Sequence, residues 1–282
     1  MKRYQEKFFE NSSTRIVIQD IFPTLFTDLS KSKTIILQLI KRDTYSQFRQ
    51  QITGVLWLII SPLVSVIGYL VMYTLGILKP GSSSYPYFIF LIIGVGLWGL
   101  MAVSTSTIAS SLVNQGDLIL RTNIPIIAIP FSSSGRILLA YISHLASLST
   151  LMLIFKVPVG KYWILYPIFS LLPILYGIGF GLIFSIWQVV SREINSLVQV
   201  ALQLGFFLTP ALFNRNLPLH RFGVVLKFNP LSYIVETPRS ILLERNPIGL
   251  VGFGWSLLLS ICTLLFGFVF FYKKSSIIAE RL

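Results

Sequence analysis

Few side chains in this sequence have the chemistry needed for catalysis or metal binding. The two histidines, His144 and His220, are far apart in the chain, and neither has a second histidine at the spacing of a helical metal pair. The single cysteine, Cys262, lies in an apolar run, so neither an intrachain disulfide nor a thiolate cluster can form. We therefore predict no metal site and no catalytic residue. His144 lies inside an apolar stretch and is retained as a candidate polar lining.

The sequence also lacks the motifs that bind nucleotides or couple transport to ions. No glycine-rich phosphate loop ending in Gly-Lys-Ser or Gly-Lys-Thr is present. No Asp or Glu lies deep in any long apolar run, whereas ion-driven transporters carry ionisable groups there. The same absence of acidic residues disfavours a selective cation channel, which would need a ring of carbonyls or carboxylates. These observations favour a permease that is powered by a separate ATPase.

The composition predicts the elements that hold the remaining residues. Of 282 residues, 54% are hydrophobic and 12% are charged, whereas soluble domains have about 25% charged residues. Apolar runs of a length that crosses about 30 Å of hydrocarbon are read as spans. We predict an all-α membrane protein with six transmembrane helices, at residues 53–78, 85–109, 131–155, 163–190, 196–213 and 250–272.

The distribution of basic residues predicts the orientation. The net charge is +13, but the Lys and Arg residues lie between apolar runs, which favours membrane phosphates over nucleic acid as the partner. With both termini in the cytoplasm, fifteen of the 23 basic residues face inward. The first fifty residues have no apolar core of the length that a signal peptide needs. A multi-pass protein with both termini cytoplasmic is therefore predicted.

Two flanking elements complete the predicted organisation. The segment SKSKTIILQLIKRDTYSQFR alternates apolar and basic residues, which suits an amphipathic helix in the membrane interface; a solvated helix beside the first span is the alternative. Residues 214–248 contain short half-apolar stretches, which we predict to be re-entrant external helices. The predicted divisions are a cytoplasmic N-terminal segment (1–51), a six-span domain (52–272) and a cytoplasmic tail (273–282). The basic residues of the interface helix are Lys33, Lys41, Arg42 and Arg49.

Small and polar residues inside the spans predict how the helices pack. Gly177, Gly179 and Gly181 permit close helix approach. The polar stretch from Ser104 to Thr107 is predicted to serve helix packing, and a wet path is the alternative.

Four stretches resemble ABC type-2 permeases that export polysaccharides. RDTYSQFRQQITGVLWLIISPL resembles the entry to their first span, and SLVNQGDLILRTNIPIIAIPFSS resembles their cytoplasmic loop after the second span. QLGFFLTPALF resembles their fifth span, and FNPLSYIVETPRSILL resembles their external segment before the last span. The four stretches occur in the same order as in that family and cover most of the chain.

The resemblance implies a homodimer with two copies of a separate nucleotide-binding subunit, which binds ATP and Mg, so this chain itself carries no cofactor. It implies export of a lipid-linked polysaccharide, such as O-antigen, capsule or teichoic acid, across a bacterial inner membrane. Residues in the loop match the coupling helix that docks on the ATPase: Asn114, Asp117, Leu118 and Arg121. Residues matching the external re-entrant region are Asn229, Pro230 and Glu236.

A sugar chain crossing the membrane would be served by aromatic rings with hydrogen-bonding neighbours. The candidates for this path are Trp57, Tyr69, Tyr73, Trp98, Phe206 and Phe207. Core packing or lipid contact is the alternative role for each ring. The alternative functions are a permease for a drug or lipid, a membrane-embedded transferase, and a scaffold that recruits a partner through the loop at Asp117.

Overall fold

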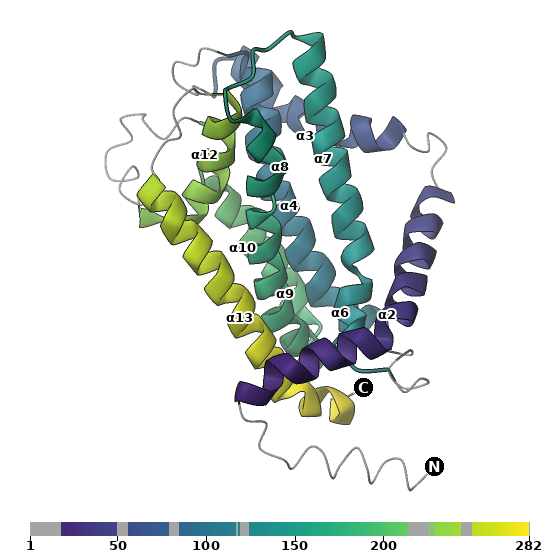
Figure 1. Ribbon diagram of the computed structural model, residues 1–282. Coiled ribbons are helices and arrows are strands. Elements are labelled where there is room, and N and C mark those ends of the chain that lie inside the picture. The colour runs from purple at the N-terminus through teal and green to yellow at the C-terminus, as the bar shows by residue number, and fades with distance from the viewer. Residues whose placement is uncertain are drawn as a thin grey trace, which may run out of the picture.

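The computed structural model describes residues 18–49, 56–78, 85–116, 118, 124–213, 226, 228–243 and 250–281, and every regular element within these ranges is a helix. The all-α prediction is therefore confirmed for the described part of the chain. Figure 1 shows an elongated bundle in which α4 (Tyr87–Asn114), α7 (Ser134–Ile154) and α9 (Leu172–Val190) run along the long axis.

The central helix is α4. Its buried residues begin at Tyr87 and continue to Leu112, and they lie on all sides of the helix. A helix that is apolar all round belongs in a protein core or a membrane. Neighbouring helices cover it, including α3 (Leu56–Thr74) and α10 (Glu193–Phe207).

Glycines set the distance between α9 and α4. A Cβ on Gly177 would lie 2.5 Å from the Met101 carbonyl oxygen, and one on Gly181 would lie 2.6 Å from the Ile108 Cβ. These two glycines are four residues apart, so they lie on one face of α9. Ser104 is buried in this contact and donates to the Leu100 carbonyl oxygen of its own helix, at 2.7 Å. Ser104 therefore packs in the α4–α9 contact, which agrees with the packing role predicted for the Ser/Thr stretch.

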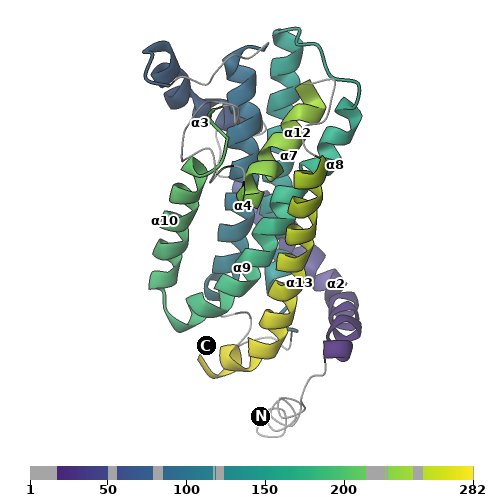
Figure 2. The same cartoon turned by 90° about the vertical axis from the view of Figure 1, so that its left-hand side faces the viewer.

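The opposite face of α9 packs on α13 (Leu250–Arg281). A Cβ on Gly179 would lie 2.7 Å from the Thr263 carbonyl oxygen, and one on Gly267 would lie 2.5 Å from the Gly179 carbonyl oxygen. The backbones of α9 and α13 are therefore in contact at Gly179 and Gly267, where neither residue has a side chain. Figure 2 shows α13 and α9 side by side. Helix α9 is thus held between α4 and α13.

Five helical stretches are long and apolar enough to cross a membrane within the described ranges. The predicted fifth span, 196–213, corresponds to α10, which has 15 residues and ends at Phe207. Its length of about 22 Å is short of a hydrocarbon core of about 30 Å. Pro210 explains the early end, since the residues before a proline disfavour helix. The count of six remains a prediction. The five stretches are Leu56–Thr74, Tyr87–Asn114, Ala128–Ile154, Trp163–Val190 and Phe253–Lys274.

The fourth of these stretches is interrupted near its beginning. It consists of a 3-10 turn, η1 (Trp163–Leu165), the short helix α8 (Tyr166–Phe169) and then α9. Pro167 and Pro173 lie in the first turns of α8 and α9 and account for the break, because proline cannot donate the backbone hydrogen bond that a continuous helix needs. The Tyr141 hydroxyl of α7 donates to the Pro167 carbonyl oxygen at 2.6 Å, so the interruption is supported from a neighbouring helix.

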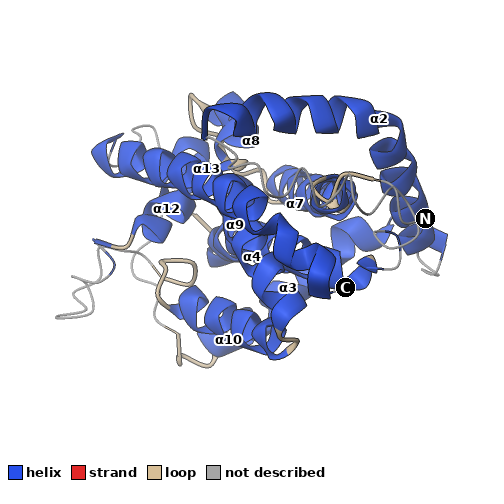
Figure 3. Ribbon diagram, turned by 90° about the horizontal axis from the view of Figure 1, so that it is seen from below, coloured by secondary structure: helices blue, strands red, loops and turns tan. Residues whose placement is uncertain are grey.

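The N-terminal helix is longer than predicted and is bent. Helix α2 (Ile18–Arg49) runs across the lower end of the bundle and then turns upward (Figures 1 and 3). Ser32 and Leu39 are buried, while Lys33, Lys41 and Arg42 are exposed. The side chain of Arg49 lies outside the described residues. The amphipathic pattern is present, and a location in the membrane interface remains a prediction.

The segment before the last apolar stretch, predicted to be external, contains α12 (Pro230–Leu243), and α6 (Ala128–Ser132) precedes α7. With 14 residues, about 21 Å, α12 is too short to cross a membrane. It lies at the end of the bundle opposite α2 (Figure 1).

Candidate functional site

Four of the six aromatic residues predicted to line a path lie together. Tyr69 of α3 and Trp98 of α4 both face Phe206 of α10, with ring centroids 5.5 and 6.2 Å away. Phe207 packs edge-on against Phe206 at 5.4 Å. A Cβ on Gly205 would lie 2.9 Å from the Trp98 ring, so glycine at this position admits the indole. We call these four rings the aromatic cluster; three helices meet at it.

The other two predicted path residues lie elsewhere on α3. Tyr73 packs on Tyr87 of α4 at 4.4 Å, and Tyr87 stacks on Phe90 at 5.9 Å. Trp57 lies near the start of α3 with 42% of its surface exposed, and the structure does not bring it into the aromatic cluster.

Burial separates the rings of the aromatic cluster into two groups. Trp98 and Phe206 are each 7% exposed, so they pack between α4 and α10. Phe207 is 57% exposed, and Tyr69 is half-buried. The accessible rings, which a passing ligand could touch, are therefore Phe207 and Tyr69, together with Tyr73 beside them on α3.

The residues that follow α10 form a turn whose carbonyl oxygens accept hydrogen bonds from side chains. We call residues 208–212 the carbonyl turn. The Asn229 amide nitrogen donates to the Leu208 oxygen at 2.7 Å, and the Tyr87 hydroxyl donates to the Leu212 oxygen at 2.7 Å. Asn229 also accepts from the Leu231 backbone at 3.0 Å, which orients it at the start of α12. Carbonyl oxygens at the C-terminal end of a helix have no backbone N–H donor within the helix. The side chains of Asn229 and Tyr87 supply donors in its place.

Arg239 of α12 binds the middle of the carbonyl turn. Its Nη1 donates to the Pro210 oxygen at 2.9 Å, and its Nη2 donates to the Ala211 oxygen at 3.1 Å. The guanidinium lies 3.7 Å from the centroid of the Phe90 ring, an attractive cation–π contact. The sequence analysis did not single out Arg239. It lies in the stretch 214–248, which is predicted to be re-entrant, and a charge at membrane depth must find partners; this is the signal that could have identified it.

The predicted external residues lie in and just before α12. Asn229 supports the carbonyl turn, and Pro230 begins the helix and accepts at 2.9 Å from the Ser256 hydroxyl of α13. Glu236 is half-buried on α12. Asn229 and Pro230 therefore attach the start of α12 to its neighbours, and the assignment of all three residues to an external re-entrant region remains a prediction.

His144 is a buried packing residue in this structure. Its Nε2 lies 2.7 Å from the Tyr166 hydroxyl, and a Cβ on Gly96 would lie 2.2 Å from its Nδ1. The imidazole therefore fills the space over a glycine of α4 and ties α7 to α8. With 2% of its surface exposed, it does not line an accessible path here.

The predicted ATPase-coupling loop follows α4 at the α2 end of the bundle. Asn114 is exposed at the last residue of α4, and the Leu118 backbone donates to the Gln115 carbonyl oxygen at 3.0 Å. Asp117 and Arg121 lie outside the described residues.

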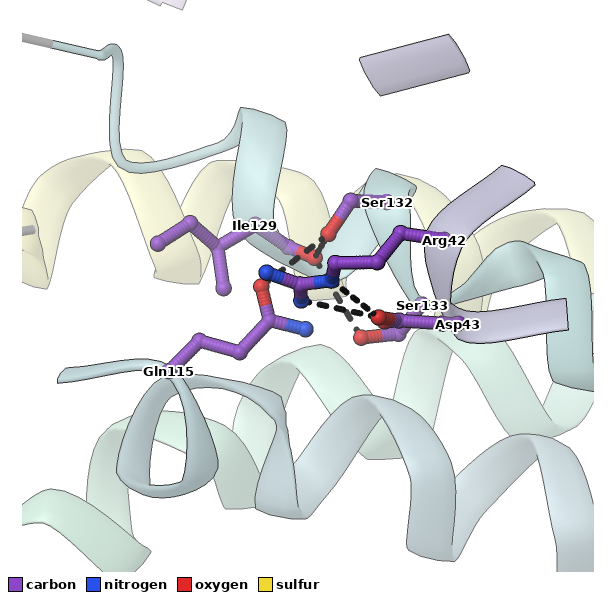
Figure 4. A network of polar contacts seen from close by, with 6 residues as sticks. All are labelled: Arg42, Asp43, Gln115, Ile129, Ser132 and Ser133. Carbon is purple, nitrogen blue, oxygen red and sulfur yellow. Dashed lines mark hydrogen bonds and ion pairs between the residues drawn. The ribbon is translucent and has the colours of Figure 1, made fainter. Parts of the chain in front are cut away.

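Figure 4 shows how this end of α4 meets α6 and α2. The Ser132 hydroxyl donates to the Gln115 side-chain oxygen at 3.3 Å, and Arg42 and Asp43 of α2 form an ion pair at 2.8 Å beside them. A Cβ on Gly135 would lie 3.0 Å from Ile40, so α2 packs closely on the start of α7. The N-terminal helix therefore lies against the two ends of the predicted coupling loop.

Comparison with known proteins identifies the family of this fold. A family model described as ABC-2 type transporter matches residues 34–243, from α2 to the last residue of α12. The O-antigen export system permease protein RfbA of Myxococcus xanthus is 24% identical over 229 residues, which cover 79% of this chain and 79% of that protein. Two proteins of the same description from Klebsiella pneumoniae are 21% and 20% identical over 211 residues, covering 74% of this chain and 80% of each.

The matched region contains the aromatic cluster, the carbonyl turn and the loop after α4. Together with the apolar helices described above, the match shows that the chain belongs to the ABC-2 type transporter family, as a multi-pass membrane permease homologous to O-antigen export permeases.

Proposed function

We propose that this chain is the membrane subunit of an ATP-driven exporter that moves a lipid-linked, O-antigen-like polysaccharide to the outer face of a bacterial inner membrane. The observation that carries the proposal is the similarity to O-antigen export permeases over 79% of both chains. Two copies of the chain form the membrane part, and two copies of a separate nucleotide-binding subunit hydrolyse ATP with Mg in the cytoplasm. Both termini lie in the cytoplasm, and α10 together with the carbonyl turn that follows it makes the sixth crossing.

The arrangement of the bundle supports this division of roles. The C-terminal end of α4 lies at the same end of the bundle as α2 and the C-terminal end of α13 (Figure 1), where a cytoplasmic ATPase would dock on the loop that carries Asp117 and Arg121. Movement at this loop would reach α2 through the contacts at Gly135 and beside Ser132. The aromatic cluster offers flat rings of the kind that sugars stack on, at the junction of three helices.

The first test asks whether the loop couples to an ATPase. The chain is co-purified with the nucleotide-binding subunits of its own cell, and ATP hydrolysis is measured in lipid vesicles. We expect the double variant Asp117→Ala/Arg121→Ala to lower hydrolysis several-fold, because it removes the two charges available for docking. Lys161→Ala is the matched control, since Lys161 is exposed and follows Gly160, whose backbone donates to Leu242 of α12, and α12 lies at the end of the bundle opposite α2 (Figure 1).

The second test asks what is carried. Deleting the gene should abolish the surface polysaccharide and leave lipid-linked precursor inside the cell. Unchanged surface glycan would exclude polysaccharide export and leave a drug or lipid permease. If no ATPase subunit co-purifies, the exporter itself is rejected, and the scaffold and transferase alternatives return.

A further inference from the structure

The packing of α10 raises the question of what holds this helix in place. Its buried residues are Val198 and Phe206, while Leu197, Val200 and Leu204 are all more than half exposed. Figure 2 shows α10 at the edge of the bundle. Along its length it touches α4 through a 3.1 Å hydrogen bond from Gln199 to Ser106 and through the aromatic cluster. Its C-terminal end, by contrast, is held by a set of directed bonds.

Those bonds come from two elements that are distant in sequence. Asn229 and Arg239, from the start and the third turn of α12, donate to the oxygens of Leu208, Pro210 and Ala211. Tyr87, at the start of α4, donates to the Leu212 oxygen. In an apolar environment a carbonyl oxygen without a hydrogen-bond donor costs free energy. The C-terminal end of α10 is therefore most stable in the position where its carbonyl oxygens reach these donors.

The surface beneath Arg239 is shaped to receive its guanidinium. Tyr87, Phe90 and Gly94 lie on one face of α4 at helical spacing. A Cβ on Gly94 would lie 2.2 Å from Nη2 of Arg239 and 2.3 Å from the Ala211 oxygen. Phe90 supplies the ring face at 3.7 Å. Arg239 is 7% exposed, so its charge is used inside the protein and not presented to solvent.

We infer that Arg239 is a positioning residue for transport: it fixes the C-terminal end of α10 against α4 and α12, and thereby sets where Phe206 and Phe207 stand in the aromatic cluster. This inference rests on the proposed export function. Arginine suits the task because its planar fork donates to two successive carbonyls while its face stacks on a ring. A lysine would offer one point charge and no planar face.

The test replaces the arginine and then restores the attachment by other means. In a Cys262→Ser background, Leu208→Cys and Asn229→Cys place thiols on the two residues that a hydrogen bond joins in the native protein. Arg239→Gln is added, with Lys161→Gln as the control for loss of a positive charge at an exposed position. A short bifunctional thiol reagent links the cysteines, and both link yield and polysaccharide export are measured.

We expect Arg239→Gln to lower the link yield and export several-fold, and Lys161→Gln to change neither. Arg239→Lys should recover export in part at most. Once the link has formed in the Arg239→Gln protein, export should return toward the level of the linked protein that retains Arg239, because the covalent bridge replaces the lost attachment.

Two results would overturn the inference: a link yield that does not respond to Arg239→Gln, or a formed link that leaves export low. The link yield requires no transport, so it separates this inference from the proposed function. If the chain exported no polysaccharide, every variant would fail in export, while the yield would still report whether Arg239 holds the end of α10.

Discussion

Asp28 and Tyr272 join the first and the last of the described helices, α2 and α13. The Tyr272 hydroxyl of α13 donates to Oδ2 of Asp28 on α2 at 3.3 Å. Burial raises the pKa of Asp28 above its ordinary value, while the bond from Tyr272 and the charge of Lys31 oppose that rise. The folded protein therefore holds this proton to a higher pH than the unfolded chain does, and ionised Asp28 costs the folded state some stability.

Asp28→Asn should consequently stabilise the protein in a pH-dependent way. Below its ordinary pKa of about 4, Asp28 is protonated in both the folded and the unfolded state and does not lower the free energy of unfolding. As the pH rises from there through the raised pKa of the folded state, Asp28 ionises and the free energy of unfolding falls. The melting temperature of Asp28→Asn should therefore equal that of the parent protein in acid and exceed it increasingly toward neutral pH. Tyr272→Phe removes a donor to the carboxylate, so it should move the parent's transition to higher pH. A constant difference at all pH values would contradict this account.

Arg239 and His144 show which residue roles local sequence could not supply. His144 lies in an apolar run and Arg239 in a half-apolar stretch, so the sequence marks each as a polar residue in need of a partner. The partners are Pro210 and Ala211 for the arginine and Tyr166 for the histidine, all brought close by the tertiary fold. No periodicity within α12 or α7 specifies these pairings.

At the scale of elements, the glycines of α9 give a prediction with an internal control. Gly177→Ala should destabilise the protein by about 1–3 kcal/mol, because its Cβ would overlap the α4 backbone and force the helices apart. Gly99→Ala, on α4, meets nothing within 4 Å and should be neutral or stabilising by up to about 1 kcal/mol. Detergent unfolding of the two purified variants measures the difference. Equal losses would show that glycine packing does not set the α4–α9 distance.

The helix boundaries show how far sequence periodicity reaches. The glycines predicted close packing, and the structure gives the surfaces they meet, Met101 on one side and Thr263 on the other. The prolines at 167 and 173 coincide with the interruption between α8 and α9. The predicted span at 196–213 extends beyond Pro210, whereas the helix ends at Phe207. The residues after Phe207 are also apolar, so composition alone does not indicate the helix end. Composition identifies apolar segments well, and chain-breaking residues then decide their lengths.

At the scale of the whole molecule, the six-crossing topology can be tested by the side on which cysteines react. In a Cys262→Ser background, Lys161→Cys and Phe228→Cys should react with an impermeant reagent outside intact inner-membrane vesicles of native orientation, and Arg192→Cys should not. Phe228 is 82% exposed, and Lys161 and Arg192 are also exposed. Labelling of Phe228→Cys from the same side as Arg192→Cys would show that α10 does not cross the membrane.

The general architecture was accessible from the sequence, whereas the functional geometry was not. An all-helical membrane chain, its apolar helices and its family follow from composition and from four resembling stretches. The sequence predicted six aromatic residues as candidates for the path, and four of them come together in the aromatic cluster. Trp57 falls outside because the position of a ring on α3 depends on how that helix crosses its neighbours.

The order in which α4, α9 and α13 appear along the chain has a consequence for biogenesis. These three helices form the glycine-packed centre, yet α4 ends at Asn114, α9 begins at Leu172 and α13 begins at Leu250. Synthesis at about 5–20 residues per second delivers the last of them well after the first. Until Gly267 leaves the ribosome, the face of α9 at Gly179 has no partner. Helices α4 and α9 can pair through Gly177 and Gly181 as soon as α9 is in the membrane, whereas the α13 side of the centre closes as one of the last events of synthesis.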